Sequence, residues 1–424
     1  MFWYHSTTKH SYNSVRTNPN RLSWEDQPTT YKNYPDSYRK VKLDLERDED
    51  NFLYHIAGLT AKKTYPSGSY YLRINPSAGA LYPNELYFQA RSVAGVEDGI
   101  YHYEVSSSSL TLLQSITEKE GLEPYLGYET AMQGYLFLVS AVYYRSSWKY
   151  KNRAFRYCLL DAGHLLGSIE ASALLRSKAV EIRYNIEREK LNLMFGFEER
   201  EWMLAGCTMA EPIEGDNVDP IEFSLPYVEA SGTFEPNKLM EQAYRETMQL
   251  EACQREGTVP IFTYDRAKLQ ETIFMRRSQR GFQGGAITKG QFQYIIDAIH
   301  QPIPSDCDEE VSVYMVLNRV LDMPLGLYKD GAYIKYGDFA RKAGYLCLEQ
   351  YSLSQQGAVA FFLTSKARNY QALYQKAGII GHRLYMAALY LGIGCSGIGA
   401  YYDDEVNTFV ENDEMVLYAL AIGK

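Results

Sequence analysis

Four short segments carry residues whose types and spacing could do chemistry. The first is the arginine segment, Arg276-Arg277-Ser278-Gln279-Arg280. Its three guanidinium groups and one hydroxyl can donate paired hydrogen bonds to a phosphate or to the carbonyl-rich edge of a ring. The ordinary alternative is a solvated basic patch. The segment therefore predicts either an anion site or an exposed positive surface.

The second and third segments are rich in small residues. The small-residue loop, Asn75–Pro83, lets bare backbone approach a flat ligand, although a structural turn also explains it. The glycine-rich segment, Leu391–Ala400, has four glycines directly after a helical pattern. The end of a helix accounts for one glycine. The others predict a loop that aims backbone N–H groups at an anion or at a heteroaromatic nitrogen.

The fourth segment contains the pair Lys149-Tyr150, within Trp148–Arg153. It lies between a predicted strand and a predicted long helix. An amine beside a phenol can take a proton from a substrate or return one. A charged surface loop is the commoner explanation for such a run.

Hydrophobic periodicity predicts the elements that must position these segments. The predicted helices are Asp50–Ala61, Phe155–Arg176, Lys289–His300 and Tyr370–Leu391. The predicted strands are Leu86–Arg91, Tyr135–Tyr144, Val311–Asn318, Ala358–Thr364 and Met415–Ile422. This order indicates an α+β fold, with mixed, mainly antiparallel sheets and helices packed on them, rather than a Rossmann fold.

The chain also repeats itself. Gly99-Ile100-Tyr101 matches Gly326-Leu327-Tyr328 after similar strand patterns, and Asp161–His164 matches Lys376–Ile379 at the start of similar helices. Two matches in the same order predict two related halves. We expect an N-terminal arm at 1–30, a first half at 31–210, an acidic linker with a bridging helix at 211–260, and a second half at 261–424.

Composition excludes several classes of function. The 424 residues include 43 Lys and Arg against 52 Asp and Glu, a net charge of −9, which argues against binding nucleic acid. The longest apolar runs reach about half of the ~20 residues that span a membrane, and no signal segment is visible, so a cytoplasmic protein is expected. Six scattered cysteines and seven histidines without metal-ligand spacing predict neither a disulfide scaffold nor a metal site.

Taken together, the segments resemble the nitroreductase-like flavin fold, and in particular its SagB-type (ThcOx-like) dehydrogenase branch in a tandem form. The resemblance covers nearly the whole chain. It rests on Pro76–Pro83, on Lys149-Tyr150 followed by Arg153–Tyr157 and Asp161–His164, on the arginine segment, and on the opening runs Thr8–Tyr12 and Trp24–Pro28.

The resemblance implies one FMN, bound at the seam of a pseudo-dimer formed by the two halves. The matching positions are Arg276, Arg277, Ser278 and Arg280 for phosphate, ribityl chain and pyrimidine; Pro76, Ser77, Ala78 and Gly79 for the isoalloxazine; and Ile398, Gly399 and Ala400 for flavin N5. A second site is expected to be lost. The positions expected to correspond are Pro35–Arg39 for the arginine segment, Lys178–Lys190 for the glycine-rich segment, and Pro304–Cys307 for the small-residue loop.

The activity implied by this branch is oxidation of thiazoline or oxazoline rings in a peptide, with hydride transfer to FMN. Lys149 would act as base, which requires its amine to be partly neutral, and Tyr150 would relay or donate a proton. A cyclodehydratase complex is the implied partner, and the fused halves could dimerise further. Two alternatives stay open: an FMN oxidoreductase acting on another small molecule, and a flavin-holding protein without turnover. The sequence also leaves open the substrate, the oxidant that returns FMN to its resting state, and whether Lys424 binds phosphate.

Overall fold

The computed structural model describes residues 2–18, 22–65, 68–251, 253–366 and 368–424. The chain forms two compact units. Unit 1 consists of Met1–Leu22, Pro260–Pro302 and Glu309–Lys424, and unit 2 consists of Ser23–Val259 and Ile303–Asp308. The N-terminal residues thus belong with the C-terminal half, and a short segment near 305 belongs with the first half.

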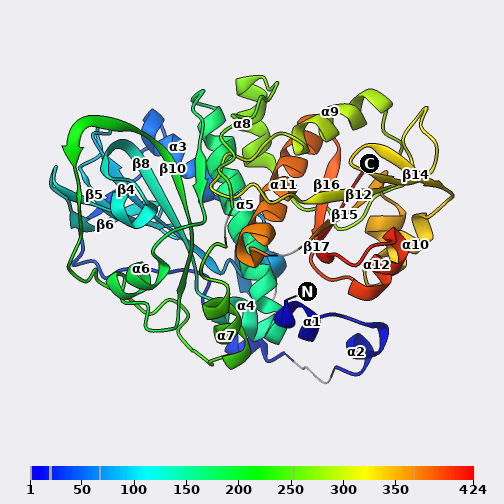
Figure 1. Cartoon of the computed structure of the whole chain (residues 1–424), viewed down its shortest axis with the longest axis horizontal. Coiled ribbons are helices and arrows are strands. Elements are labelled where there is room, and N and C mark those ends of the chain that lie inside the picture. Colours follow the sequence, from blue (N-terminus) through cyan, green and yellow to red (C-terminus); the bar gives the residue numbers. More distant parts are fainter. Residues whose placement is uncertain (1, 19–21, 66–67, 252, 367) are drawn as a thin grey trace. The chain divides into compact units, whose positions relative to one another are not determined.

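Unit 2 is built on a seven-stranded antiparallel sheet with the order β1-β6-β5-β4-β8-β10-β9 (Figure 1). Its strands are β1 (Lys40–Lys42), β4 (Asn84–Arg91), β5 (Gly99–Glu104), β6 (Ser109–Ser115), β8 (Thr130–Ala141), β9 (Glu181–Arg183) and β10 (Trp202–Asn217). Smaller elements are β2 (Leu59–Tyr65), β3 (Gly68–Arg73), β7 (Glu120–Gly121) and β11 (Asp219–Pro220). Its helices are α3 (Asp48–Ala57), α4 (Tyr144–Tyr150), α5 (Ala154–Leu174), α6 (Arg188–Met194) and α7 (Lys238–Glu246), with short turns at Trp24–Asp26, Ala78–Ala80, Glu123–Leu126 and Lys151–Arg153.

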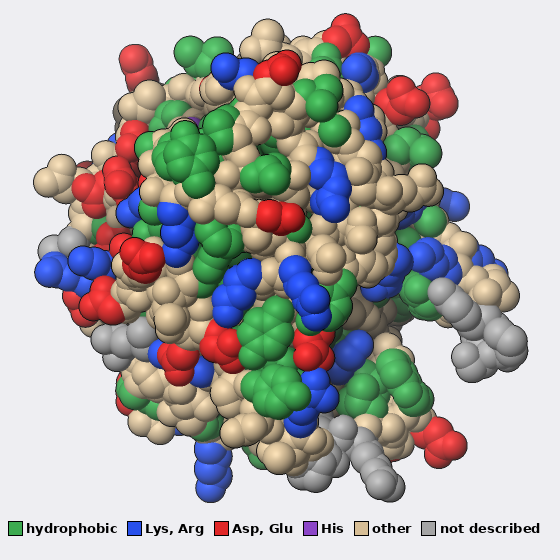
Figure 2. All heavy atoms as spheres, turned by 90° about the vertical axis from the view of Figure 1, so that its right-hand side faces the viewer, with side chains coloured by type: hydrophobic (Ala, Val, Ile, Leu, Met, Phe, Trp, Pro, Cys, Tyr) green, Lys and Arg blue, Asp and Glu red, His purple; other side chains and the backbone are tan. Residues whose placement is uncertain are grey.

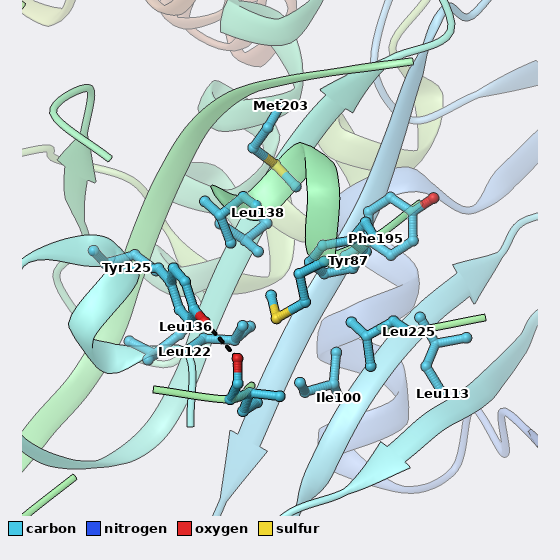
Figure 3. Close-up of a cluster of buried hydrophobic side chains, with 14 of the residues drawn as sticks. Tyr87, Ile100, Leu113, Leu122, Tyr125, Leu136, Leu138, Phe195, Met203 and Leu225 are labelled. Atoms are coloured by element: carbon cyan, nitrogen blue, oxygen red, sulfur yellow. Dashed lines mark hydrogen bonds between the residues drawn. The ribbon is translucent and has the colours of Figure 1, made fainter. Parts of the chain in front are cut away.

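Both faces of this sheet are covered, because successive side chains of a strand point to opposite sides. On one side Phe137 contacts Phe52 of α3, with ring centroids 6.2 Å apart, and α5 packs on the sheet. On the other side Tyr87 contacts Phe195, with centroids 4.9 Å apart. Figure 3 shows this second cluster, in which Leu136 and Leu138 of β8 lie with Leu122 and Tyr125, from the turn that precedes that strand. The two-sided core makes α5 a rigid base for the residues it carries.

Unit 1 is built on a six-stranded antiparallel sheet with the order β14-β13-β12-β15-β17-β16. The strands are β12 (Ser312–Leu317), β13 (Gly326–Lys329), β14 (Ala332–Tyr336), β15 (Val359–Ser365), β16 (Gly394–Ile398) and β17 (Met415–Gly423). The helices are α1 (Trp3–Thr7), α2 (Tyr12–Arg16), α8 (Arg266–Met275), α9 (Lys289–Ile299), α10 (Ala340–Leu346), α11 (Tyr370–Tyr390) and α12 (Asp403–Val410), with a π-helical turn at Tyr351–Gln355. Helix α11 packs along β16 and β17 (Figure 1).

The two sheets share one topology. The order β6-β5-β4-β8-β10-β9 in unit 2 matches β14-β13-β12-β15-β17-β16 in unit 1, strand for strand along the chain. Gly99 begins β5 and Gly326 begins β13. The long helices α5 and α11 occupy the same place in chain order: α5 lies between β8 and β9, and α11 lies between β15 and β16. The predicted α+β fold with two similar halves is confirmed.

Four local predictions were wrong. The helix predicted to reach Ala61 ends at Ala57, because Gly58 stops it and β2 begins at Leu59. The strand predicted to reach Tyr144 ends at Ala141, and the Lys149-Tyr150 pair closes helix α4 instead of lying in a loop. Half of the glycine-rich segment, Gly394–Ile398, is an edge strand, β16, paired with β17, rather than a loop.

The surface drawn in Figure 2 carries acidic and basic side chains intermixed with apolar ones, without a broad field of one sign. Across the described parts of the chain, every helix is too short or too polar to cross a bilayer. Within those same residues no group of three or more His, Cys, Asp or Glu side chains is placed to hold a metal ion.

Candidate functional site

The arginine segment lies along the edge strand of unit 1. Helix α8 ends at Met275, and the chain then runs beside β16, where Ser278 bridges Cys395 in parallel fashion. The N–H of Gln279 donates to the carbonyl oxygen of Cys395 at 3.0 Å. The arginine segment therefore pairs with the edge of the sheet through one isolated bridge, next to the glycine-rich segment.

Tyr385 of α11 joins these two segments. Its hydroxyl lies 2.7 Å from the Ser278 hydroxyl and accepts a hydrogen bond from the N–H of Gly397 at 2.7 Å. Burial raises the pKa of Tyr385 to about 12, so the phenol stays neutral at ordinary pH. The structure thus brings the arginine segment alongside β16, which ends at Ile398 and is followed by Gly399 and Ala400. The described geometry gives unit 1 one continuous cluster of donors.

The three arginines differ in their surroundings. Arg276 is only 3% exposed, and its guanidinium carbon lies 5.6 Å from the centroid of the Tyr385 ring. Arg277 turns back and donates to the carbonyl oxygen of Phe274 at 3.1 Å, which satisfies the open end of α8. Arg280 is exposed. Burial, assisted by the Arg276 charge, lowers the pKa of His382 to about 3, so this neighbouring imidazole is neutral.

Close packing explains part of the glycine content of β16. A Cβ atom at Gly397 would lie 2.0 Å from the hydroxyl oxygen of Tyr418, and one at Gly394 would lie 2.6 Å from Cγ of Gln279. Gly392 has a φ of 70° just after α11, a conformation that favours glycine at a helix end. Three of the four glycines are therefore needed for the backbone itself, whatever ligand the segment meets.

In unit 2 the small-residue loop is held in an unusual conformation. Gly79, Ala80 and Tyr82 have φ values of 65°, 55° and 45°, all in the left-handed region. Asp161 of α5 fixes the loop from below. Its carboxylate accepts the Ser77 hydroxyl at 2.5 Å and the Ala78 N–H at 3.2 Å. The rigid helix thereby positions the tip of the loop at Gly79.

Lys149 and Tyr150 lie over that tip. A Cβ atom at Gly79 would lie 2.7 Å from the Tyr150 hydroxyl oxygen and 3.1 Å from Nζ of Lys149. The Lys149 Nζ also lies 5.9 Å from the ring centroid of Trp24. Tyr150 stacks at a tilt on Tyr157, with centroids 4.3 Å apart. The φ of residue 79 favours glycine, and the missing side chain leaves room for the ends of Tyr150 and Lys149.

Asp161 gives this cluster a dependence on pH. Burial raises the pKa of its carboxyl to about 7 from 3.8, although the Ser77 and Ala78 hydrogen bonds favour the charged form and oppose the rise. The folded state therefore binds this proton more tightly than the unfolded chain does. The tighter binding of this proton stabilises the folded state fully at pH values below 3.8, and this contribution is lost as the pH rises through about 7.

We expect Asp161→Asn to remove that pH dependence. Between about pH 4 and pH 8, the wild-type contribution should fall by about 4 kcal/mol, whereas the amide does not titrate. Unfolding midpoints of both proteins, measured across this range, should give a difference that changes steadily with pH. A constant difference would show that the Asp161 carboxyl titrates normally in the folded protein.

Three residues of these clusters had no role assigned from sequence. Asp161 and Trp24 stand in runs that carried the family resemblance, so those runs offered a signal for them. Tyr385 is one of 38 tyrosines, and nothing in the sequence singled it out. Its position one helical turn after His382 on α11 becomes informative only once β16 is placed beside that helix.

The expected correspondence between the halves at the second site was wrong for two segments, Pro35–Arg39 and Pro304–Cys307. Residues 35–39 lead into β1, at the sheet edge opposite β9. The segment beside β9 is instead Ile303–Asp308, where Ser305 bridges Ile182 as Ser278 bridges Cys395 in unit 1. There the Asp306 carboxylate accepts the N–H groups of Tyr184 at 2.8 Å and Asn185 at 3.0 Å. Unit 2 thus carries an acidic residue at the edge where unit 1 carries arginines.

Lys424 lies close to the arginine segment in unit 1. Its carbonyl oxygen accepts the N–H of Gln283 at 2.7 Å, three residues after Arg280. A Cβ atom at Gly285 would lie 2.8 Å from the Cβ of Lys424. The last strand, β17, therefore delivers Lys424 to the loop that follows the arginines.

Residues 273–424, which include the arginine segment and β16, match the model of the Nitroreductase family. A crystal structure from Anabaena variabilis, named provisionally as a nitroreductase, is similar over 100% of this chain and 98% of its own, with 26% identity and a TM-score of 0.83. The chain thus has the nitroreductase fold along its whole length.

Two curated proteins are similar over shorter stretches. MJ1384 of Methanocaldococcus jannaschii, also named provisionally as a nitroreductase, is 31% identical over 96 residues, which make up 22% of this chain and 48% of that protein. The trifolitoxin-processing protein TfxB of Rhizobium leguminosarum bv. trifolii is 28% identical over 136 residues, 28% of this chain and 33% of that protein. The chain matches less than half the length of either relative.

Proposed function

From this nitroreductase-like fold we propose an FMN-dependent oxidoreductase that oxidises thiazoline or oxazoline rings in a peptide. The observation that carries the proposal is the placement of Lys149 and Tyr150 over the Gly79 loop. An amine and a phenol held side by side next to bare backbone suit removal of a proton from a planar heterocycle. The name of TfxB, a toxin-processing protein, supports a peptide as the substrate.

The donors of unit 1 fit FMN. A flavin phosphate needs cationic and hydroxyl donors, and the flavin ring needs positive charge at its pyrimidine edge and an amide near N5. Arg276, Ser278 and Arg280 supply the first set, and the backbone that follows β16 supplies the amide. Arg277 caps α8 and is the weakest candidate of the four predicted positions. When bound, FMN would supply an acceptor for a hydride.

The residues of unit 2 would handle the proton. Lys149 would take it as the neutral amine, and its reference pKa of about 10.4 must fall for this to happen near neutral pH. Tyr150, which packs against Tyr157, would orient the Lys149 amine through a hydrogen bond or pass the proton onward. Asp161 would act through the loop, since it touches Ser77 and Ala78 and lies beneath the tip.

A second candidate is reduction of a small molecule by an FMN oxidoreductase with a nicotinamide donor. The names of MJ1384 and of the Anabaena variabilis protein favour it. The two candidates differ in what reduces the flavin. A synthetic thiazoline peptide should bleach flavin absorbance and lose two hydrogen masses if the main proposal is right. Bleaching by NADPH alone, with the peptide inert, would establish the second candidate instead. No bleaching by either reagent would indicate a flavin-holding protein without turnover.

A further inference from the structure

A pair of thiols in unit 2 lies apart from both clusters. The Sγ atoms of Cys253 and Cys307 are 2.7 Å apart, closer than two unbonded sulfur atoms normally approach. Cys253 is half-buried, whereas Cys307 and the other four cysteines are buried. Cys253 is therefore the cysteine that a dissolved reagent can reach most readily, and its immediate neighbour is a second thiol.

Hydrogen bonds hold the backbone of both chain segments that carry the cysteines. Glu256 and Ser305 exchange two backbone hydrogen bonds, at 2.8 and 2.9 Å. The N–H of Gln254 donates to the Asp308 carboxylate at 3.1 Å, and the Cys253 thiol donates to the same oxygen at 3.3 Å. These contacts hold the two chain segments in register. A disulfide between the thiols therefore needs little movement of the backbone.

We propose that Cys253 and Cys307 are a thiol modification site. The two thiols form a reversible disulfide with each other by exchange with a small-molecule disulfide such as oxidised glutathione. The Cys253 thiolate attacks one glutathione sulfur, and the other glutathione leaves as a thiolate. Cys307 then loses its proton to solvent and attacks Sγ of Cys253, which releases the second glutathione. Two protein thiols are oxidised and one glutathione disulfide is reduced to two thiols, so electrons and protons balance.

The bond would close a ring that contains residues 260–302, including α8, the arginine segment and α9. A crosslink over such a loop restricts the unfolded chain and raises the unfolding temperature. It would also fasten the Ile303–Asp308 segment, whose Ser305 pairs with β9. This inference is independent of the proposed flavin chemistry, because none of its groups belongs to either cluster.

The test uses the full chain equilibrated with graded mixtures of oxidised and reduced glutathione, then alkylated with N-ethylmaleimide and digested. Mass spectrometry should find the Cys253 peptide joined to the Cys307 peptide, with dithiothreitol restoring both thiols. The oxidised protein should unfold several degrees higher than the reduced one. If both cysteines remain alkylated in the most oxidising mixture, or if Cys253 joins a different cysteine, the proposal is wrong.

Two variants separate the steps. Cys307→Ala should stop the reaction at a mixed disulfide, visible as one glutathione attached to Cys253. Cys253→Ser should take up no glutathione at position 307 and should show no oxidation-dependent change in its unfolding midpoint. Glutathione on Cys307 of the Cys253→Ser variant would overturn the assigned order of attack. Neither readout requires FMN or a substrate.

Discussion

Lys149→Met should lose about two to four orders of magnitude in the rate of substrate oxidation while keeping its bound flavin. Removal of a general base typically has an effect of this size. Lys149 stands over the tip of the Gly79 loop in unit 2, whereas the donors that fit FMN lie in unit 1. The change should therefore appear in kcat rather than in flavin content, measured by flavin absorbance after gel filtration.

The matched control is Lys151→Met, two residues along the chain. Lys151 is exposed and begins the turn after α4, so its replacement removes the same charge from the same surface. It should change turnover less than threefold. Tyr150→Phe helps to divide the roles. Loss of a relay should lower the rate but keep its increase with pH, which a lysine base produces as its amine becomes neutral. Normal turnover by Lys149→Met would show that Lys149 is not the base.

Arg276→Met should weaken FMN binding by about one to two orders of magnitude, the usual consequence of losing hydrogen bonds to a charged group. Arg276 is buried beside Tyr385, so the variant must first be shown to fold, by circular dichroism and by its unfolding midpoint. Binding is then measured by titrating the flavin-free protein with FMN and following the quenching of flavin fluorescence.

Two neighbours make this result interpretable. Arg277→Met should cost much less affinity, because the Arg277 guanidinium contacts the carbonyl end of α8. Ser278→Ala removes one hydroxyl and keeps the backbone bridge to Cys395, so a moderate loss is expected from a protein of normal stability. Equal losses in Arg276→Met and Arg277→Met would show that net charge, rather than the position of Arg276, determines binding.

The parts of the fold that were predictable have long, regular patterns. Helices α5 and α11 each extend over 21 residues and lie within one or two residues of the predicted bounds. The buried strands β12, β15 and β17 were found for the same reason. The repeated Gly-Ile-Tyr and Gly-Leu-Tyr runs indicated the duplication because both glycines occupy the same position in the shared strand order.

What escaped prediction depends on contacts between distant residues. The pattern of β16 is set by glycines that make room for Tyr418 and Gln279, so no alternation of apolar side chains announces a strand. The N-terminal residues join unit 1 through contacts such as the His10 N–H to Asp403, 2.8 Å long and 393 residues apart in sequence. Ser305 pairs with β9 in the same long-range way. No local pattern encodes such pairings.

The interleaved course of the chain through the two units limits where the protein can be cut into fragments. Neither unit is one uninterrupted stretch of polypeptide, since Met1–Leu22 and Ile303–Asp308 each belong with the more distant half. A truncation after Val259 would leave the first fragment without Ile303–Asp308, the segment whose Ser305 bridges β9, and would expose that edge to aggregation. A fragment beginning at Pro260 would lack α1 and α2. Separate production of the halves therefore requires grafting these short pieces back, or rearranging the order of the chain.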